Sequence, residues 1–477
     1  MALQSLSTSN NTRIHSGIKK IWIAIALFWS FPFLFYLVHL STLVNYLYPI
    51  AALALGIVLY RSYPELYLGH MWWLWFITPE IRRLVDYQIG FQPVSPIMLT
   101  PYLVTLLAFF TVVMYLPTLR RKSLFPMAIA AIGAVYGYMV GIINAGLLPA
   151  TFGALNWLLP IFMGLHMAIH WRRYETFKNT IIKTFVWGAL IMGLYGLIQY
   201  VNPPPWDRYW MLASKMLSIG LPVPYHVRIF STMNSPGPFA IEIMGALLML
   251  AAGGGRWRIP AAVFGYSSLL LSMVRTAWGG WVVAMVYLIY RLNPKNTLRY
   301  FLGGLIIIAL AFPILSFGPI AKNIDARFQS IQNVQKNASY KTRVTFYEDF
   351  FDEAFGTPLG VGIGNTGVAA RLSSSAHVVN FDSGIMEIPY VLGWIGGGFF
   401  YIGGIWILLH ILGSRWNKVD PFIAVSSSIA LAVMSTLPFI NNLIGTGGML
   451  FWGFSGMSVA GIQFYSKSAE NAYEQQE

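Results

Sequence analysis

Three arginines occupy polar segments beside apolar stretches of the sequence: Arg228, Arg275 and Arg343. A guanidinium group presents a planar fork of N–H donors that matches two phosphate oxygens at once. Inserting an arginine into a membrane within a hydrophobic hairpin costs about 2.5–3.5 kcal/mol. Arg275 lies at the apex between two short apolar stretches. It therefore either reaches the interface to anchor phosphate headgroups or binds an anion in a protected site. Together, the three arginines suggest a site for a lipid diphosphate headgroup.

The surroundings of two of these arginines suggest how they are positioned. Arg228 belongs to a stretch rich in proline and glycine that ends where an apolar helix begins. We expect Asn234 or Ser235 to cap that helix, whose positive end could also face an anion. Arg343 lies on a predicted amphipathic helix over 338–354, whose aromatic residues indicate that one face packs against other parts of the chain.

The composition shows what kind of chain carries these residues. Of 477 residues, 56% are hydrophobic and only 10% are charged, whereas soluble domains carry roughly 25% charged residues. The mean hydropathy is +0.60. Apolar runs of about 17 to 22 residues recur along the chain, long enough to cross a bilayer core of about 30 Å. The sequence therefore predicts an integral membrane protein.

These runs predict an all-α, polytopic membrane protein of 12–14 transmembrane helices with one large extracytoplasmic loop. We divide it into an N-terminal bundle over 1–318, the loop over 319–383, and C-terminal helices with a short tail over 384–477. Within the loop, the helix 338–354 and a flexible glycine-rich turn over 356–365 are expected to form a lid above a groove. The expected spans are 21–38, 43–60, 66–79, 98–117, 124–143, 152–170, 181–200, 235–254, 259–274, 276–290, 300–318, 384–411, 421–438 and 444–464.

The distribution of basic residues predicts the orientation. With the N-terminus inside, 19 of the 31 lysines and arginines fall in cytoplasmic segments, as the positive-inside rule requires. Both termini are then cytoplasmic, and the large loop faces the outside. The net charge of +14 reflects this pattern, so we expect membrane lipid and no nucleic acid as partner. The chain has no cysteine, which excludes disulfides and thiolate chemistry.

Further polar residues within the apolar runs have simpler explanations. Glu242 should face the interior of the bundle because exposure to lipid would be costly, and a functional role stays open. His166 and His170, four residues apart, could ligate a metal, but no third ligand is evident. With Arg172 and Arg173 following, the end of a cytoplasmic helix is the better interpretation, and we expect neither a metal nor a cofactor.

Four stretches of the sequence together resemble the O-antigen ligase/O-antigen polymerase superfamily. They run from Arg228 to Gly237, from Ser272 to Trp278 (Ser-Met-Val-Arg-Thr-Ala-Trp), from Arg343 to Gly362, and from Asp382 to Gly396. The resemblance covers about 225–400 and the plan of many spans with one large late loop. It implies a GT-C-like glycosyltransferase of the bacterial inner (plasma) membrane, active on the periplasmic face, that uses no metal or nucleotide cofactor.

The resemblance also implies roles for individual residues. Arg228, Arg275 and Arg343 would hold the diphosphate of an undecaprenyl-diphosphate-linked glycan. Ligases of this family carry a histidine where Asp382 stands here, and His377 is the nearest histidine. Either side chain could accept the proton of an acceptor hydroxyl, with Asp382 preferred. Independently of the resemblance, Glu387 lies five positions after Asp382, where it would either support Asp382 or lie exposed at the membrane interface. Asn234 is the other residue expected to support the site.

On these grounds we expect an inverting transfer of a glycan to a glycan or lipid-core acceptor, in the biosynthesis of lipopolysaccharide or another cell-envelope polysaccharide. The aspartate in place of histidine favours a polymerase or another polysaccharide-transferring member of the family over a ligase. A transporter or flippase of lipid-linked oligosaccharides is the alternative, although such a protein tends to show two similar halves, which are not evident here. A third possibility is an assembly scaffold without catalytic activity, but such a protein would have no need of arginines arranged around one site.

Overall fold

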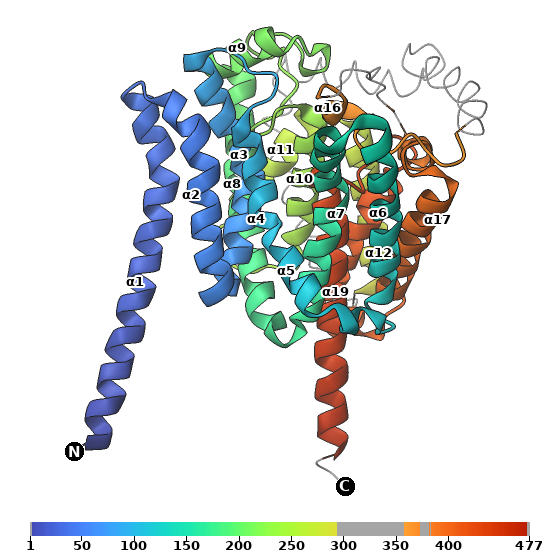
Figure 1. Cartoon of the computed structure of the whole chain (residues 1–477). Helices are drawn as coiled ribbons and strands as arrows, with labels where there is room; N and C mark the ends of the chain where they lie inside the picture. The colour runs from blue at the N-terminus through green and yellow to red at the C-terminus, as the bar shows by residue number, and fades with distance from the viewer. Residues whose placement is uncertain (1, 293–356, 373–380, 382, 475–477) are drawn as a thin grey trace.

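The computed structural model describes residues 2–292, 357–372, 381 and 383–474. Within these residues the chain is helical without any strand (Figure 1). Isolated β-bridge positions occur between Gly220 and Val227 and at Thr366. Seven helices in this part of the chain are long and apolar enough to cross a membrane, and three shorter apolar helices accompany them. The prediction of an all-α membrane protein is thereby confirmed. Most of the large loop (319–356, 373–380 and 382) and the span expected at 300–318 lie outside the described residues.

The other expected spans all coincide with helices, because only a helix satisfies every backbone group of an apolar segment internally. Proline opens several of them, at the first helical position where its missing N–H costs nothing. The span expected at 98–117 is interrupted and consists of three short helices, η1, α4 and α5. The helices that match the expected spans are α1 (Ala2–Leu37), α2 (Ser41–Ser62), α3 (Pro64–Ile89), η1 (Pro96–Leu99), α4 (Thr100–Thr105), α5 (Leu107–Met114), α6 (Phe125–Ala145), α7 (Leu147–Ile169), α8 (Tyr174–Val201), α10 (Pro236–Met249), α11 (Arg258–Leu271), α12 (Arg275–Arg291), α17 (Gly384–Leu412), α18 (Pro421–Ser435) and α19 (Gly445–Glu474).

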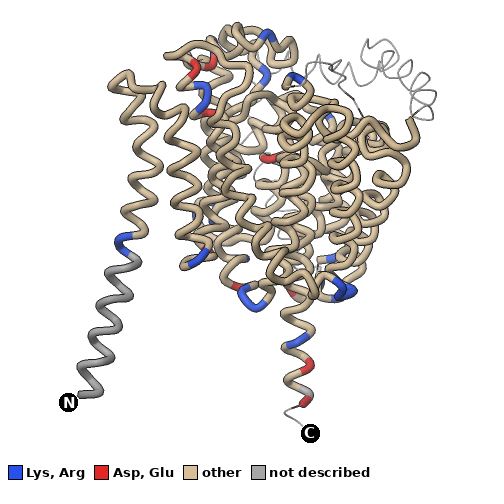
Figure 2. The backbone as a smooth tube through the Cα atoms, viewed as in Figure 1, with Lys and Arg blue, Asp and Glu red and all other residues tan. Residues whose placement is uncertain are grey.

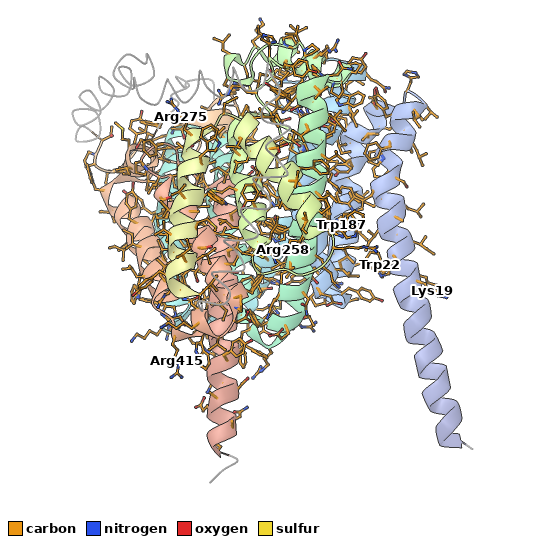
Figure 3. The ribbon with its side chains drawn as sticks, turned by 180° about the vertical axis from the view of Figure 1, so that it is seen from behind. Lys19, Trp22, Trp187, Arg258, Arg275 and Arg415 are labelled. Atoms are coloured by element: carbon orange, nitrogen blue, oxygen red, sulfur yellow. The ribbon has the colours of Figure 1, made fainter. Side chains whose placement is uncertain are left out.

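The bundle has two distinct ends. Both termini lie at one end (Figure 1). The opposite end, called the distal end below, carries the short helices α9 (Pro205–Ser214) and α16 (Gly367–Ala370). Arg275 lies at the distal end and Arg415 at the end of the termini (Figure 3). Lysines and arginines occur at both ends of the bundle and are sparse between them (Figure 2).

A glycine-rich extended segment, 358–364, is inserted between α6, α7 and α17. The amide of Ile363 donates to Gly137 in α6 at 2.9 Å, and those of Val361 and Gly362 donate at 2.9 Å to carbonyls of α17. A Cβ on Gly141 of α6 would fall on the carbonyl oxygen of Ile363 and 2.8 Å from its amide nitrogen. The described part of this segment is therefore packed between three helices, which the interpretation as a flexible turn did not anticipate.

Helix α17 is broken where it receives this segment. Gly393 has φ 67° and ψ 177°, a conformation that divides the helix into two halves. The carbonyls of Tyr390 and Val391, freed by the break, accept the amides of Val361 and Gly362, and the amide of Trp394 donates to Pro358 at 3.0 Å. The two irregular segments thus satisfy each other, which is the condition for non-helical backbone within a membrane.

Candidate functional site

The segment that carries Arg228 folds back on itself at the distal end. The amide of Leu221 donates to His226 at 3.1 Å, and the amide of Arg228 donates to Ile219 at 3.0 Å. These bonds form a narrow hairpin between α9 and the loop that leads into α10. Arg228 therefore begins the loop over 228–235, called the arginine loop below.

The Arg228 side chain contacts the turn between α11 and α12. Its Nε donates to the carbonyl of Ser272 at 3.3 Å, and a terminal nitrogen donates to that of Met273 at 3.2 Å. Met273 has a positive φ of 57°, and Arg275 follows as the first residue of α12, half-buried like Arg228. Two arginines 47 positions apart are thus joined through one short turn.

The remaining predicted site residues are only partly described. Arg343, His377 and Asp382 lie outside the described residues, so a three-arginine site and a catalytic base stay predictions. Glu387 lies in the first turn of α17, half-buried, with its carboxyl group beside the Asn441 side chain. This places Glu387 against protein rather than on a fully exposed surface.

Asn234 lies at the end of the arginine loop, where it contacts α9. Its carbonyl accepts the indole N–H of Trp210 at 3.0 Å, and its amide nitrogen lies 3.6 Å from the Met98 sulfur. Ser235 is the residue before α10, and its side chain makes no capping hydrogen bond. The expected side-chain cap is therefore not formed, and Asn234 serves to attach the loop to its neighbours.

The structure reveals a buried ionic cluster that the sequence did not indicate. The Arg83 side chain is fully buried, pairs with Asp207 of α9 at 3.0 Å, and also pairs with Glu80 one turn earlier in α3. It further donates to the backbone carbonyl of Ser231 in the arginine loop. Arg83 thereby links α3, α9 and the arginine loop.

Gln199 of α8 completes the attachment of the arginine loop. Its Oε1 accepts the amides of Phe230 at 3.0 Å and Ser231 at 2.9 Å, and its Nε2 donates to Asp207 at 2.7 Å. The Ser231 hydroxyl donates to the carbonyl of Met192 at 2.6 Å. Ser231 has φ 48°, which is uncommon for a residue with a side chain, so these bonds hold a strained backbone.

Burial dominates the electrostatics of this cluster. Desolvation raises the pKa of the Asp207 carboxyl group, and the neighbouring Arg83 opposes that shift. Breaking such a pair by removing one partner typically costs about 3–5 kcal/mol because the other charge is left buried and uncompensated. The cluster therefore holds the arginine loop firmly only while its charges stay balanced.

Glu80, Arg83 and Asp207 were not singled out from the sequence. The spacing of Glu80 and Arg83, three residues apart on one helix, was an available sign of an ion pair. Asp207 lies 124 positions beyond Arg83, and nothing local in the sequence joins the two.

The other polar residues within the helices fit the simpler explanations. Glu242 is fully buried in α10, facing the interior of the bundle as expected. His166 bonds Thr111 through Nδ1 at 2.7 Å, and His170 bonds the carbonyl of His166 at 2.9 Å. No group of three or more metal-ligating side chains occurs in the part of the chain that the structure describes.

The fold and the composition together define a multi-pass α-helical membrane protein. Comparison with protein-family models finds no match, and comparison with curated protein sequences finds none either.

Proposed function

We propose that this protein transfers a glycan from a polyprenyl-diphosphate-linked donor to an acceptor hydroxyl at the distal end of the bundle. The observation that carries the proposal is the contact of Arg228 with the turn that immediately precedes Arg275. It brings two arginines to one place at the end of an apolar bundle, where a lipid-anchored diphosphate would present its charge. The resemblance of the surrounding segments to the O-antigen ligase/O-antigen polymerase superfamily supports the same chemistry.

In this proposal, Arg228, Arg275 and Arg343 bind the donor diphosphate. Charge-assisted bonds to its oxygens stabilise the negative charge that grows as the glycosidic oxygen departs. The acceptor oxygen attacks the anomeric carbon, the bond from that carbon to the diphosphate breaks, and undecaprenyl diphosphate leaves. The acceptor proton passes to Asp382, or alternatively to His377. One displacement inverts the anomeric configuration, and the protein acts at the periplasmic face of the bacterial inner membrane.

Conservative substitutions test the roles of the two described arginines. Arg228→Lys and Arg275→Lys keep the charge but lose the planar fork of donors. Losing one charge-assisted bond costs about 1.5–3 kcal/mol, which corresponds to a loss of about tenfold or more in donor affinity. Arg415→Lys, at the opposite end of the bundle, is the matched control and should bind and transfer normally.

The assay uses purified protein in proteoliposomes with a defined undecaprenyl-diphosphate-linked oligosaccharide. Donor binding, glycan transfer and movement of the donor across the bilayer are measured separately. Transfer that is lost in Arg275→Lys and kept in Arg415→Lys supports the enzyme. Movement without transfer would show the transporter instead, and normal binding and turnover in Arg275→Lys would refute the assigned role.

A further inference from the structure

The Tyr195 hydroxyl group lies between the two carboxyl groups of the Arg83 cluster. Its oxygen is 2.9 Å from Glu80 Oε1 and 2.9 Å from Asp207 Oδ2, and it accepts the indole N–H of Trp206 at 2.8 Å. A tyrosine hydroxyl has one proton to donate. It can therefore bond only one of the two carboxylates if both are ionised.

Both contacts of the Tyr195 hydroxyl group with the carboxyl groups are satisfied as hydrogen bonds if one carboxyl group carries a proton. That group then donates to the Tyr195 oxygen, and Tyr195 donates to the other carboxylate. Asp207 is the better stabilised anion, because it also accepts a hydrogen bond from Gln199 at 2.7 Å and forms an ion pair with Arg83 at 3.0 Å. Glu80 is accordingly the protonated group, and it still accepts Arg83 through its second oxygen.

The charge balance leads to the same arrangement. Arg83 brings one positive charge, so two ionised carboxylates would leave a net negative charge in a largely buried site, at high cost. One shared proton makes the cluster neutral. In the described part of the chain, the titratable or charged groups that contact this hydroxyl and its two carboxyl partners are Glu80 and Arg83 from α3, Tyr195 from α8, and Asp207 from α9.

We infer that Glu80, Tyr195 and Asp207 hold one proton between the two carboxyl groups, and that the neutral cluster so formed positions the arginine loop. Arg83 and Gln199 both bind Ser231, three residues after Arg228. Loss of the proton adds an uncompensated buried charge and loosens this attachment. The consequence for anion binding by Arg228 rests on the proposed function, but the proton and its effect on the loop do not.

The pH dependence of stability tests the proton directly. A carboxyl group that keeps its proton in the folded state contributes its full stabilisation only when the pH is below the pKa of that group in the unfolded chain. That pKa is about 4. That stability is lost as the pH rises toward the pKa of the folded state. One such proton changes the folded-to-unfolded ratio about tenfold per pH unit within this window.

The decisive variant is Glu80→Gln, whose amide can donate to Tyr195 and accept from Arg83 without a titrating proton. It should fold and lose this part of the pH dependence, whereas Asp207→Asn should be destabilised at every pH because it removes the partner of Arg83. Glu175→Gln, at a partly exposed surface pair with Lys178, is the matched control and should keep the wild-type pH dependence. An unchanged slope in Glu80→Gln, or failure of that variant to fold, overturns the inference.

Hydrogen exchange measures the effect on the arginine loop. After correction for the intrinsic pH dependence, the amides of Phe230 and Ser231 should exchange faster at alkaline pH in the wild type but not in Glu80→Gln. Equal pH dependence in the two proteins refutes the positioning role. Binding of undecaprenyl diphosphate, measured in parallel, separates the two proposals, because absent binding with the expected exchange behaviour counts only against the proposed function.

Discussion

Replacing Gly141 by alanine tests whether the inserted segment 358–364 is part of the folded bundle. The new methyl group would fall on the carbonyl oxygen of Ile363, so the segment must move. Its movement would break four backbone hydrogen bonds: Ile363 to Gly137, Val361 to Tyr390, Gly362 to Val391, and Trp394 to Pro358. At about 1 kcal/mol net for each bond, the loss is about 4 kcal/mol.

The helix itself partly offsets this loss. Alanine is favoured over glycine within a helix by about 1 kcal/mol, so the expected net destabilisation of Gly141→Ala is about 3 kcal/mol. Gly398 in α17 is the matched control, because a Cβ there meets nothing within 4 Å. Gly398→Ala should therefore keep the stability of the wild type or increase it slightly.

Two measurements decide the outcome. Thermal melting of the purified protein should give a lower midpoint for Gly141→Ala than for Gly398→Ala. Because the chain has no cysteine, a single Ile363→Cys substitution reports directly on the segment, since Ile363 is only 1% exposed. The thiol should react slowly with a water-soluble reagent in the Ile363→Cys protein and faster when Gly141→Ala is added. Equal melting and equal protection would refute the reasoning.

Three further predictions concern topology, catalysis and the end of the bundle that holds the termini. A reporter fused after Asn337 should be extracytoplasmic and one after Lys418 cytoplasmic, and a cytoplasmic reading at Asn337 would reverse the orientation. Asp382→Asn should bind donor but lose transfer, because an amide cannot accept the acceptor proton at neutral pH; full turnover would exclude Asp382 as the base. Asp420 accepts Tyr174 at 2.9 Å and Lys178 at 2.8 Å, so Asp420→Asn should destabilise the protein by about 3 kcal/mol. The exposed-pair control Glu470→Gln should change stability by less than about 1 kcal/mol, and equal melting of these two variants would contradict the assigned role of Asp420.

The sequence by itself determined that the chain is a helical membrane protein and where its described long apolar segments form helices. Both properties depend on local hydropathy, because an apolar run of sufficient length must satisfy its backbone groups within itself. The same reasoning placed Glu242 in the interior of the bundle. It also singled out Arg228 and Arg275 as residues whose charge beside apolar stretches requires an explanation.

Only the tertiary structure decided which of these groups meet. The contact of Arg228 with the turn before Arg275, and the ion pair of Arg83 with Asp207, join segments that are distant in the sequence. The glycines near 360 suggested a flexible turn, yet in the structure they pack closely against α6 and α17. A residue without a side chain permits both flexibility and close approach. Local composition does not distinguish these two uses of glycine, since the neighbouring backbone that selects between them comes from elsewhere in the chain.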